Sequence, residues 1–269
     1  MKRLKLFFLL LLGYLSTQAA KVDTLAVESQ SMQKSIKNVI ITPNQYSSQK
    51  NPFAVLYLLH GAGGNYASWI KRVPEIAGYA DRYNLIIVCP DAASTSWYFD
   101  SPIDSSMRYE TYVAKELVPW IDKNYKTISN KSGRAITGLS MGGHGALYLA
   151  FRHPDIWGAA GSMSGGLDFR PFPQKWDIAL RLGPYEANKG RWDKYTVINM
   201  IPLLKDSNLK LIIDCGVNDF FLAGNRQMHT KLLEANIPHD YIERPGEHNW
   251  DYWANAIKYQ LLFFNDYFN

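Results

Sequence analysis

Short, largely apolar runs recur along this chain and constrain its fold more than any other feature. Such runs suit strands that are buried on both faces, as in a parallel sheet covered by helices. Segments with apolar residues at helical spacing lie between them, so the pattern predicts an α/β fold with a mostly parallel central sheet. The expected strands are 39–42, 53–59, 85–89, 134–139, 158–163, 209–215 and 239–244.

The helical segments complete this alternation. Pro119 lies inside one of them and predicts a kink there. The stretch from about 167 to 204 breaks the rhythm, is rich in Trp, Phe and Pro, and is interpreted as an insertion over the active-site edge of the sheet. Residues 21–269 are expected to form a single domain. The expected helices are 73–83, 109–125, 141–151, 227–235 and 253–268.

The first twenty residues form a pattern of their own. Basic residues occur within the first five positions, an apolar run covers 6–15, and small residues follow up to Ala20. This order is typical of a secretory signal peptide, and the apolar run is too short to span a bilayer. We therefore expect a signal peptide at 1–20, cut after Ala19 or one residue later, and a secreted or periplasmic protein with no membrane span. An uncleaved anchor is the alternative.

The charge balance argues against nucleic-acid binding. The chain has 29 basic and 24 acidic residues, a net charge of +5. Three of the basic residues lie in the expected signal peptide, which leaves +2, and no cluster of Lys and Arg stands out. A nucleic-acid partner is therefore not expected.

One serine stands among four glycines at 138–145, G-L-S-M-G-G-H-G, between an expected strand and an expected helix. In so abrupt a turn, side chains two residues before and after Ser140 would collide, which explains Gly138 and Gly142. The turn projects the Ser140 hydroxyl off the sheet. It also leaves the N–H of Met141 unpaired at a helix start, where it can hold an oxyanion. Ser140 is thus the candidate nucleophile.

A serine nucleophile needs a base, and the base needs an acid that orients it. Asp219 and His248 each follow an expected strand, so both fall at the carboxyl edge of the sheet. The chain order Ser, Asp, His is that of α/β-hydrolases. The other acids and histidines are less suitably placed, lying inside a strand, beside the base, or in and at the ends of other elements: Asp214, Glu247, His144, His153, His229 and His239.

Glycines also follow the expected strand 53–59, in H-G-A-G-G-N at 60–65. In this fold the matching loop donates the second N–H to the oxyanion, for which Ala62 is favoured and Gly63 is the alternative. A phosphate-binding loop does not fit, since no G-K-[ST] follows.

Four segments together resemble the esterase D family of α/β-hydrolases: H-G-A-G-G-N, G-L-S-M-G-G-H-G-A-L, C-G-V-N-D-F and P-G-E-H-N-W-D-Y-W. That family includes feruloyl esterases, acetyl esterases, S-formylglutathione hydrolases and secreted mycolyltransferases of the antigen 85 type. The resemblance covers roughly residues 35–268. It implies Ser140, Asp219 and His248 as a catalytic triad, with the Met141 and Ala62 amides as oxyanion donors.

The resemblance also favours one branch of the family. S-formylglutathione hydrolases are usually cytosolic and carry G-L-T-C where this chain has H-G-A-G-G behind an expected signal peptide. Residues 91–98, D-A-A-S-T-S-W-Y, resemble the loop that borders the cleft in the secreted carbohydrate esterases. The family's strand order places Cys89 and Cys215 about four strand spacings apart, beyond disulfide reach, so both are expected to be free, buried thiols.

We therefore expect a serine carboxylesterase that hydrolyses feruloyl or acetyl esters of carbohydrates, with an oligosaccharide or small-molecule ester as its partner and no metal or organic cofactor. An acyltransferase that uses a sugar hydroxyl, or a non-catalytic binding protein on the same scaffold, are the alternatives. About two of five tryptophans are expected to line the cleft. The candidates are Trp69, Trp97, Trp250, Trp176 and Trp192.

Overall fold

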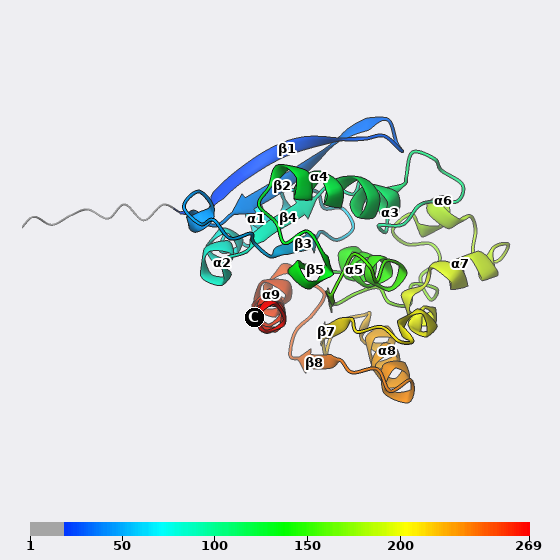
Figure 1. Cartoon of the computed structure of the whole chain (residues 1–269). Coiled ribbons are helices and arrows are strands. Elements are labelled where there is room, and N and C mark those ends of the chain that lie inside the picture. The colour runs from blue at the N-terminus through cyan, green and yellow to red at the C-terminus, as the bar shows by residue number, and fades with distance from the viewer. Residues whose placement is uncertain (1–18) are drawn as a thin grey trace, which may run out of the picture.

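The computed structural model describes residues 19–269, so residues 1–18 of the expected signal peptide lie outside the described part of the chain. At its centre is an eight-stranded sheet in the order β1-β2-β4-β3-β5-β6-β7-β8 (Figure 1). From β4 to β8 all neighbours run parallel, which confirms the expected α/β sheet. The strands are β1 (Lys21–Ser29), β2 (Lys34–Thr42), β3 (Val55–Leu59), β4 (Ile86–Pro90), β5 (Arg134–Gly138), β6 (Ala159–Met163), β7 (Lys210–Gly216) and β8 (Asp240–Arg244).

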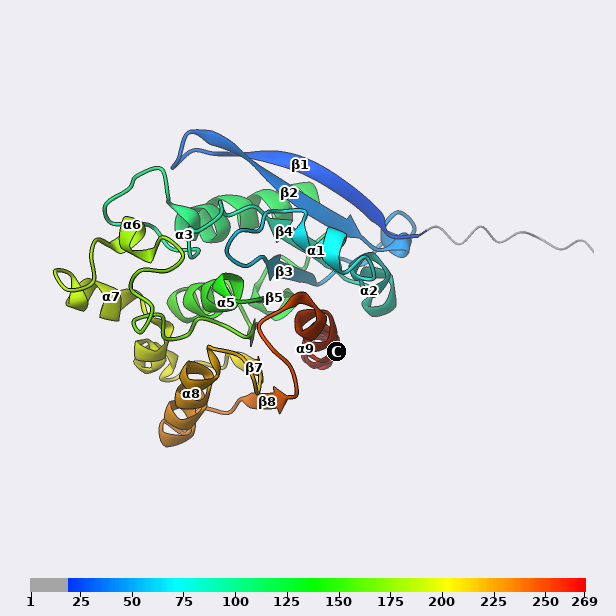
Figure 2. The ribbon, with the colours of Figure 1, turned by 180° about the vertical axis from the view of Figure 1, so that it is seen from behind.

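Helices cover both faces of the sheet (Figures 1 and 2). Along β3, Val55, Tyr57 and Leu59 pack into one hydrophobic core, and Leu56 and Leu58 pack into the other. Because both faces are buried, the strand is apolar throughout. The first core is covered by α3 (Tyr109–Thr111), η2 (Tyr112–Leu117), α4 (Val118–Asn124), α5 (Met141–Arg152) and α8 (Leu222–Glu234), and the second by α1 (Ser68–Arg72), α2 (Ile76–Tyr83) and α9 (Trp250–Phe268).

The hairpin formed by β1 and β2 was not expected from the sequence beyond residues 39–42. The two strands pair antiparallel from Lys21 with Thr42 to Ser29 with Lys34, and β2 joins the sheet antiparallel to β4. Strand β1 lies at the edge of the sheet, and most of its side chains are partly or fully exposed. An edge strand of this kind lacks the apolar run by which buried strands are recognised.

Prolines alter two of the expected helices. The expected helix 73–83 begins only at Ile76, as α2, two residues after Pro74, and the separate helix α1, which was not expected, precedes it at 68–72. The expected helix 109–125 is continuous, but its turns widen to π-helical hydrogen bonding in η2, directly before Pro119 near the start of α4. Proline lacks an N–H and crowds the carbonyl four residues earlier, so a local change of helical pitch accommodates it.

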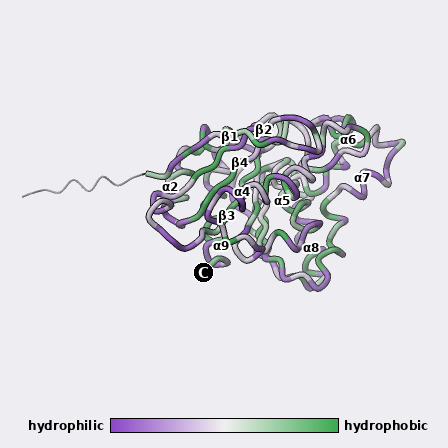
Figure 3. The backbone as a smooth tube through the Cα atoms, turned by 45° about the horizontal axis from the view of Figure 1, so that its top comes forward, coloured by the Kyte–Doolittle hydropathy of each residue, from purple (hydrophilic) through white to green (hydrophobic). Residues whose placement is uncertain are grey.

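The segment after β6 contains short helices joined by loops, seen in yellow-green beside α5 in Figure 1. Figure 3 shows the tube hydrophobic around β4 and hydrophilic over much of the outer loops. No helix within residues 19–269 combines the length and apolar character needed to cross a membrane. The short helices are α6 (Ile178–Leu182), α7 (Lys189–Tyr195), η4 (Val197–Asn199) and η5 (Ile201–Leu204), with η1 (Asn44–Tyr46) and η3 (Lys131–Gly133) elsewhere.

Both cysteines are buried, free thiols, as expected. Cys89 lies in β4 and Cys215 in β7, and three strands separate β4 from β7 in the sheet.

Candidate active site

Ser140 occupies the turn between β5 and α5 in a conformation that few residues adopt. Its φ is 56° and its ψ is −118°, a sparsely populated region whose strain costs on the order of 1–3 kcal/mol. A Cβ atom on Gly138 would stand 2.7 Å from the backbone of Gly142, and one on Gly142 would stand 2.6 Å from the carbonyl oxygen of His60. The two glycines are therefore needed for the turn to close, as the sequence argument predicted.

The structure brings the three predicted triad side chains into one chain of hydrogen bonds. His248 follows β8, and its Nε2 lies 2.9 Å from Ser140 Oγ. Its Nδ1 lies 2.8 Å from Oδ2 of Asp219, which follows β7. The other carboxylate oxygen of Asp219 accepts the N–H of Phe221 at 2.8 Å. With Asp219 accepting at Nδ1, the neutral imidazole presents a free lone pair on Nε2 toward the serine hydroxyl.

Two backbone N–H groups near Ser140 are available to a ligand. Among the described residues, the N–H groups of Ala62 and Met141 donate to no protein acceptor. A Cβ atom on Gly61 would stand only 3.2 Å from Ser140 Cβ, so the loop that carries Ala62 lies directly against the serine. Met141 begins α5, where the helix dipole adds partial positive charge. Such a pair of donors can bind an oxygen that gains negative charge.

Buried contacts hold that loop in place. His60 Nδ1 donates to the carbonyl oxygen of Gly61 at 2.8 Å, and Nε2 accepts the N–H of Ala92 at 3.1 Å. Burial lowers the pKa of His60, which favours the neutral ring that these two contacts require. The Tyr98 hydroxyl accepts the His60 N–H at 3.0 Å and donates to the His60 carbonyl at 3.1 Å. Sequence reasoning noted His60 only as part of the glycine-rich segment 60–65, which we call the glycine loop, and missed this anchoring role.

A cavity of about 410 Å³ surrounds Ser140, and we call it the serine cavity. Besides the glycine loop and His248, it is lined by Lys71, Arg72, Trp176, Phe220, Trp250 and Trp253. Phe220 packs on the His248 ring at 4.2 Å between centroids, and Trp253 packs on it edge-on at 4.9 Å. Phe220 was not predicted, although it directly follows Asp219. Trp253 was not predicted either, although it lies one helical turn after Trp250.

Two of the predicted cleft tryptophans do not lie there. Trp69 and Trp97 are each 1% exposed and belong to the hydrophobic cores, so their prediction as substrate-binding residues was wrong. The Trp69 indole N–H donates to the Leu59 carbonyl, and the Trp97 ring packs against His144 and Phe169. Of the five candidates, Trp250 and Trp176 line the serine cavity.

Asp214 and the rival histidines have other partners. Asp214 is fully buried and accepts from Arg244 and Tyr252, which agrees with a structural role. The remaining histidines also bond away from Ser140: His144 to the carbonyls of Trp97 and Tyr195, His153 to Glu110, and His229 to His239.

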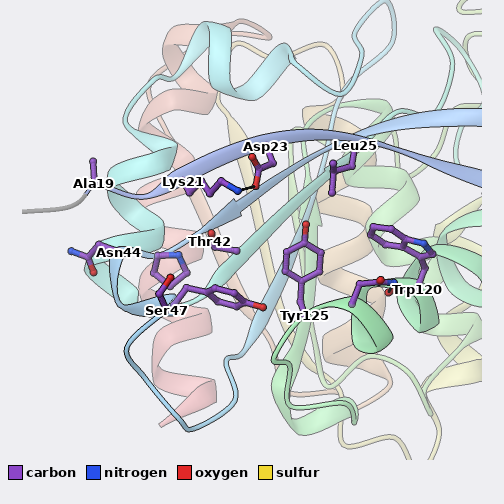
Figure 4. Close-up of a pocket in the computed structure, with 12 residues that line it drawn as sticks. Ala19, Lys21, Asp23, Leu25, Thr42, Asn44, Ser47, Trp120 and Tyr125 are labelled. Atoms are coloured by element: carbon purple, nitrogen blue, oxygen red, sulfur yellow. Dashed lines mark hydrogen bonds and ion pairs between the residues drawn. The ribbon is translucent and has the colours of Figure 1, made fainter.

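A second and larger cavity, of about 780 Å³, lies between the β1–β2 hairpin and α4, and we call it the hairpin cavity. Figure 4 shows Trp120 and Tyr125 projecting toward the underside of β1, where Lys21 and Asp23 form an ion pair at 2.8 Å. Ser47 and Asn124 also line it. No histidine is among the described residues that line it.

Known proteins share this chain's sequence and fold. The family model described as "Putative esterase" matches residues 29–264. The chain belongs to this esterase family. Esterase Rv1288 of Mycobacterium tuberculosis is 30% identical over 235 residues, which are 78% of this chain and 51% of that protein. The chain thus spans about half the length of this relative.

Two other similarities extend over most of both proteins. An acetyl esterase of Caldicellulosiruptor saccharolyticus is 27% identical over 222 residues, covering 76% of this chain and 82% of that one. The solved structure of a ferulic acid esterase superposes with a TM-score of 0.79 at 29% identity, covering 93% of this chain and 99% of that one. These similarities confirm the predicted family and the α/β-hydrolase fold.

Proposed function

We propose that this chain is a serine carboxylesterase that hydrolyses acyl esters of carbohydrates. The observation that carries the proposal is the hydrogen-bonded chain from Ser140 Oγ through His248 to Asp219, at 2.9 and 2.8 Å, beside two backbone N–H groups that donate to no acceptor within residues 19–269. Nucleophile, base, orienting acid and oxyanion donors are all supplied by the residues of the chain, so the proposed reaction requires no metal or organic cofactor.

The first step forms an acyl-enzyme. Ser140 Oγ attacks the ester carbonyl carbon while His248 Nε2 takes the hydroxyl proton. Asp219 holds the imidazole in the tautomer that can accept this proton and stabilises the imidazolium that forms. The N–H groups of Met141 and Ala62 bind the oxyanion of the tetrahedral intermediate, a contribution typically worth about 3 kcal/mol for each donor. The imidazolium then protonates the departing alcohol.

The second step releases the acid. Water enters where the alcohol has left, gives a proton to His248 and attacks the acyl carbonyl carbon. The same two N–H groups bind the second oxyanion, and Ser140 leaves with the proton returned by His248. If a sugar hydroxyl replaced the water, the same residues would carry out acyl transfer.

The choice of carbohydrate esters rests on the relatives and on the cavity. One relative is named an acetyl esterase and one structural neighbour a ferulic acid esterase. Trp176, Phe220, Trp250 and Trp253 give the serine cavity aromatic walls, which suit a sugar face or a feruloyl ring. The basic, apolar and small-residue order of residues 1–20 supports export from the cytosol.

The test is an assay on 4-nitrophenyl acetate, methyl ferulate and acetylated xylo-oligosaccharides, with the Ser140→Ala variant beside the wild type. We expect the wild type to cleave at least one ester and the variant to lose nearly all of that rate. Product analysis with added oligosaccharide distinguishes release of free acid from transfer to a sugar. A wild type that is inert on all three esters would contradict the proposal.

A further inference from the structure

Two cations stand in the wall of the serine cavity. Lys71 and Arg72 are the last two residues of α1, and both line the cavity together with Asn65 and Ser68. Among the described residues that line this cavity there is no carboxylate; Asp219 is buried behind His248. The cavity therefore presents positive charge beside the aromatic side chains and near the serine.

Arg72 is exceptional among the arginines of residues 19–269. Seven of the others pair with carboxylates, Arg82 lies over the Tyr79 ring, and Arg191 donates to the Leu182 carbonyl. Only the guanidinium of Arg72 has no ion pair, no hydrogen bond and no aromatic contact within residues 19–269. The seven are Arg108, Arg134, Arg152, Arg170, Arg181, Arg226 and Arg244.

Lys71 likewise forms no ion pair with the described residues, so no carboxylate in this part of the chain pairs with either cation. Their position at the end of α1 complements the helix dipole, but that role is met equally by side chains that extend into solvent. An anion held in the cavity would offset both charges, and a guanidinium can hold a carboxylate through two parallel hydrogen bonds.

We propose that the ester substrate carries a carboxylate, as an acylated uronic-acid sugar does, and that Lys71 and Arg72 bind this carboxylate while Ser140 attacks the ester. The inference rests on the proposed ester hydrolysis and specifies its substrate class. The aromatic side chains of the cavity receive the uncharged part of the ligand, and the basic pair fixes its orientation.

The test compares pairs of esters in which a carboxylate is replaced by its uncharged amide. For an anion on the alcohol side, 3-carboxyphenyl acetate is compared with 3-carbamoylphenyl acetate. For an anion on the acyl side, mono-4-nitrophenyl terephthalate is compared with 4-nitrophenyl 4-carbamoylbenzoate. We expect kcat/KM of the full chain to be about tenfold higher for the anionic ester of at least one pair. The pair that shows the preference identifies the half of the substrate that carries the carboxylate.

Variants assign the preference to the two cations. In the Lys71→Gln/Arg72→Gln double variant, the ratio of kcat/KM for the anionic ester to kcat/KM for its neutral partner should fall to within about twofold of unity. The Lys115→Gln/Lys123→Gln double variant removes the same charge from exposed residues of η2 and α4, outside the serine cavity, and should keep the preference. Raising the NaCl concentration from 0.05 to 0.5 M should weaken the preference of the wild type, because salt screens exposed charges.

The outcomes separate this inference from the proposed function. If the wild type cleaves neutral and anionic esters equally well in both pairs, the carboxylate inference is wrong while ester hydrolysis stands. A preference that persists in the Lys71/Arg72 double variant would also overturn the inference. If no ester in either pair is cleaved and 4-nitrophenyl acetate is also inert, the proposed function itself fails.

Discussion

The serine cavity and the hairpin cavity lie at opposite edges of the same sheet. The hairpin cavity is nearly twice as large, about 780 against 410 Å³, and it too has aromatic and charged side chains. The parallel strands end at the serine cavity, and α5 begins there with the free N–H of Met141. At the hairpin cavity α4 ends, and the Asn124 side chain already bonds to the Trp120 carbonyl.

The difference shows that strand direction matters more than cavity size for where chemistry can occur. Each parallel strand delivers its following loop to the carboxyl edge, so Ser140, Asp219 and His248 meet there although they are far apart in the chain. Helix starts at that edge supply N–H donors, whereas helix ends at the other edge present carbonyl oxygens. We therefore expect substitutions in the serine cavity to change activity and matched substitutions in the hairpin cavity to leave it unchanged.

The largest effect is expected at the nucleophile. Ser140→Ala should lower kcat/KM for 4-nitrophenyl acetate about 10⁵-fold, because the proposed acyl-enzyme forms on the Ser140 hydroxyl. The matched Ser47→Ala variant in the hairpin cavity should leave kcat/KM within twofold. Steady-state kinetics at equal concentrations of folded protein measures kcat/KM of the two variants. Comparable losses in both variants would remove the distinction between the cavities.

A smaller loss is expected at the acid. Asp219→Asn should lower kcat about 10³-fold, because an amide at this position no longer holds His248 in the tautomer that accepts the serine proton. Asp23→Asn, which breaks the ion pair with Lys21 in the hairpin cavity, should not change kcat. An Asp219→Asn variant with near wild-type kcat would show that Asp219 does not orient the base.

Loss of the Tyr98 hydroxyl, which holds the glycine loop in place, should have a moderate effect on kcat. Tyr98→Phe removes the hydroxyl that bonds to both backbone groups of His60, so we expect kcat to fall about tenfold with KM nearly constant. Tyr125→Phe is the matched change in the hairpin cavity and should alter neither constant. A Tyr98→Phe effect confined to KM would mean that the loop binds substrate in its ground state rather than stabilising the oxyanion.

Glu110 borders neither cavity, so its substitution should change the stability of the protein and leave its activity unaltered. Burial raises the pKa of its carboxyl, but hydrogen bonds from His153, Arg152 and Tyr148 outweigh burial and lower the pKa to about 2. The folded state therefore binds this proton less readily than the unfolded state. The stability it contributes is complete above about pH 4.5 and is lost as the pH falls toward 2.

Glu110→Gln should accordingly lower the free energy of unfolding by about 2 kcal/mol at pH 7 and flatten its dependence on pH below 4.5. Urea unfolding at several pH values measures both quantities. At 25 °C the kcat of the folded variant should equal that of the wild type. An unchanged acid dependence would contradict this account of Glu110.

The smallest effect on activity is expected from the aromatic wall of the hairpin cavity. Trp120→Ala should lower the free energy of unfolding by about 1 kcal/mol, since the side chain is only partly buried, and leave kcat/KM unchanged. Trp250→Ala, its counterpart in the serine cavity, should instead raise KM several-fold. Equal effects of the two substitutions on KM would imply that both cavities bind the substrate.

The features that could be predicted from sequence depend on local chain geometry. Short segments of the sequence show the glycines around Ser140 and show that Asp219 and His248 each follow a strand. The direction of the parallel strands was then enough to predict that the three residues meet. The β1–β2 hairpin was missed because an exposed edge strand has no continuous apolar run. Trp69 and Trp97 were misplaced because burial of a tryptophan depends on distant partners, such as His144 and Phe169 around Trp97. The isolation of Arg72 likewise appears only when the partners of every other arginine are known.

Covalent labelling with a fluorophosphonate, followed by peptide mapping in a mass spectrometer, tests most directly whether Ser140 is a nucleophile with His248 as its base. We expect one adduct per chain, carried by Ser140, with labelling greatly slowed in a His248→Ala variant and unaffected in Ser47→Ala. An adduct on another residue, or labelling of Ser140 at an undiminished rate without His248, would contradict the proposal that these residues form a nucleophile and its base.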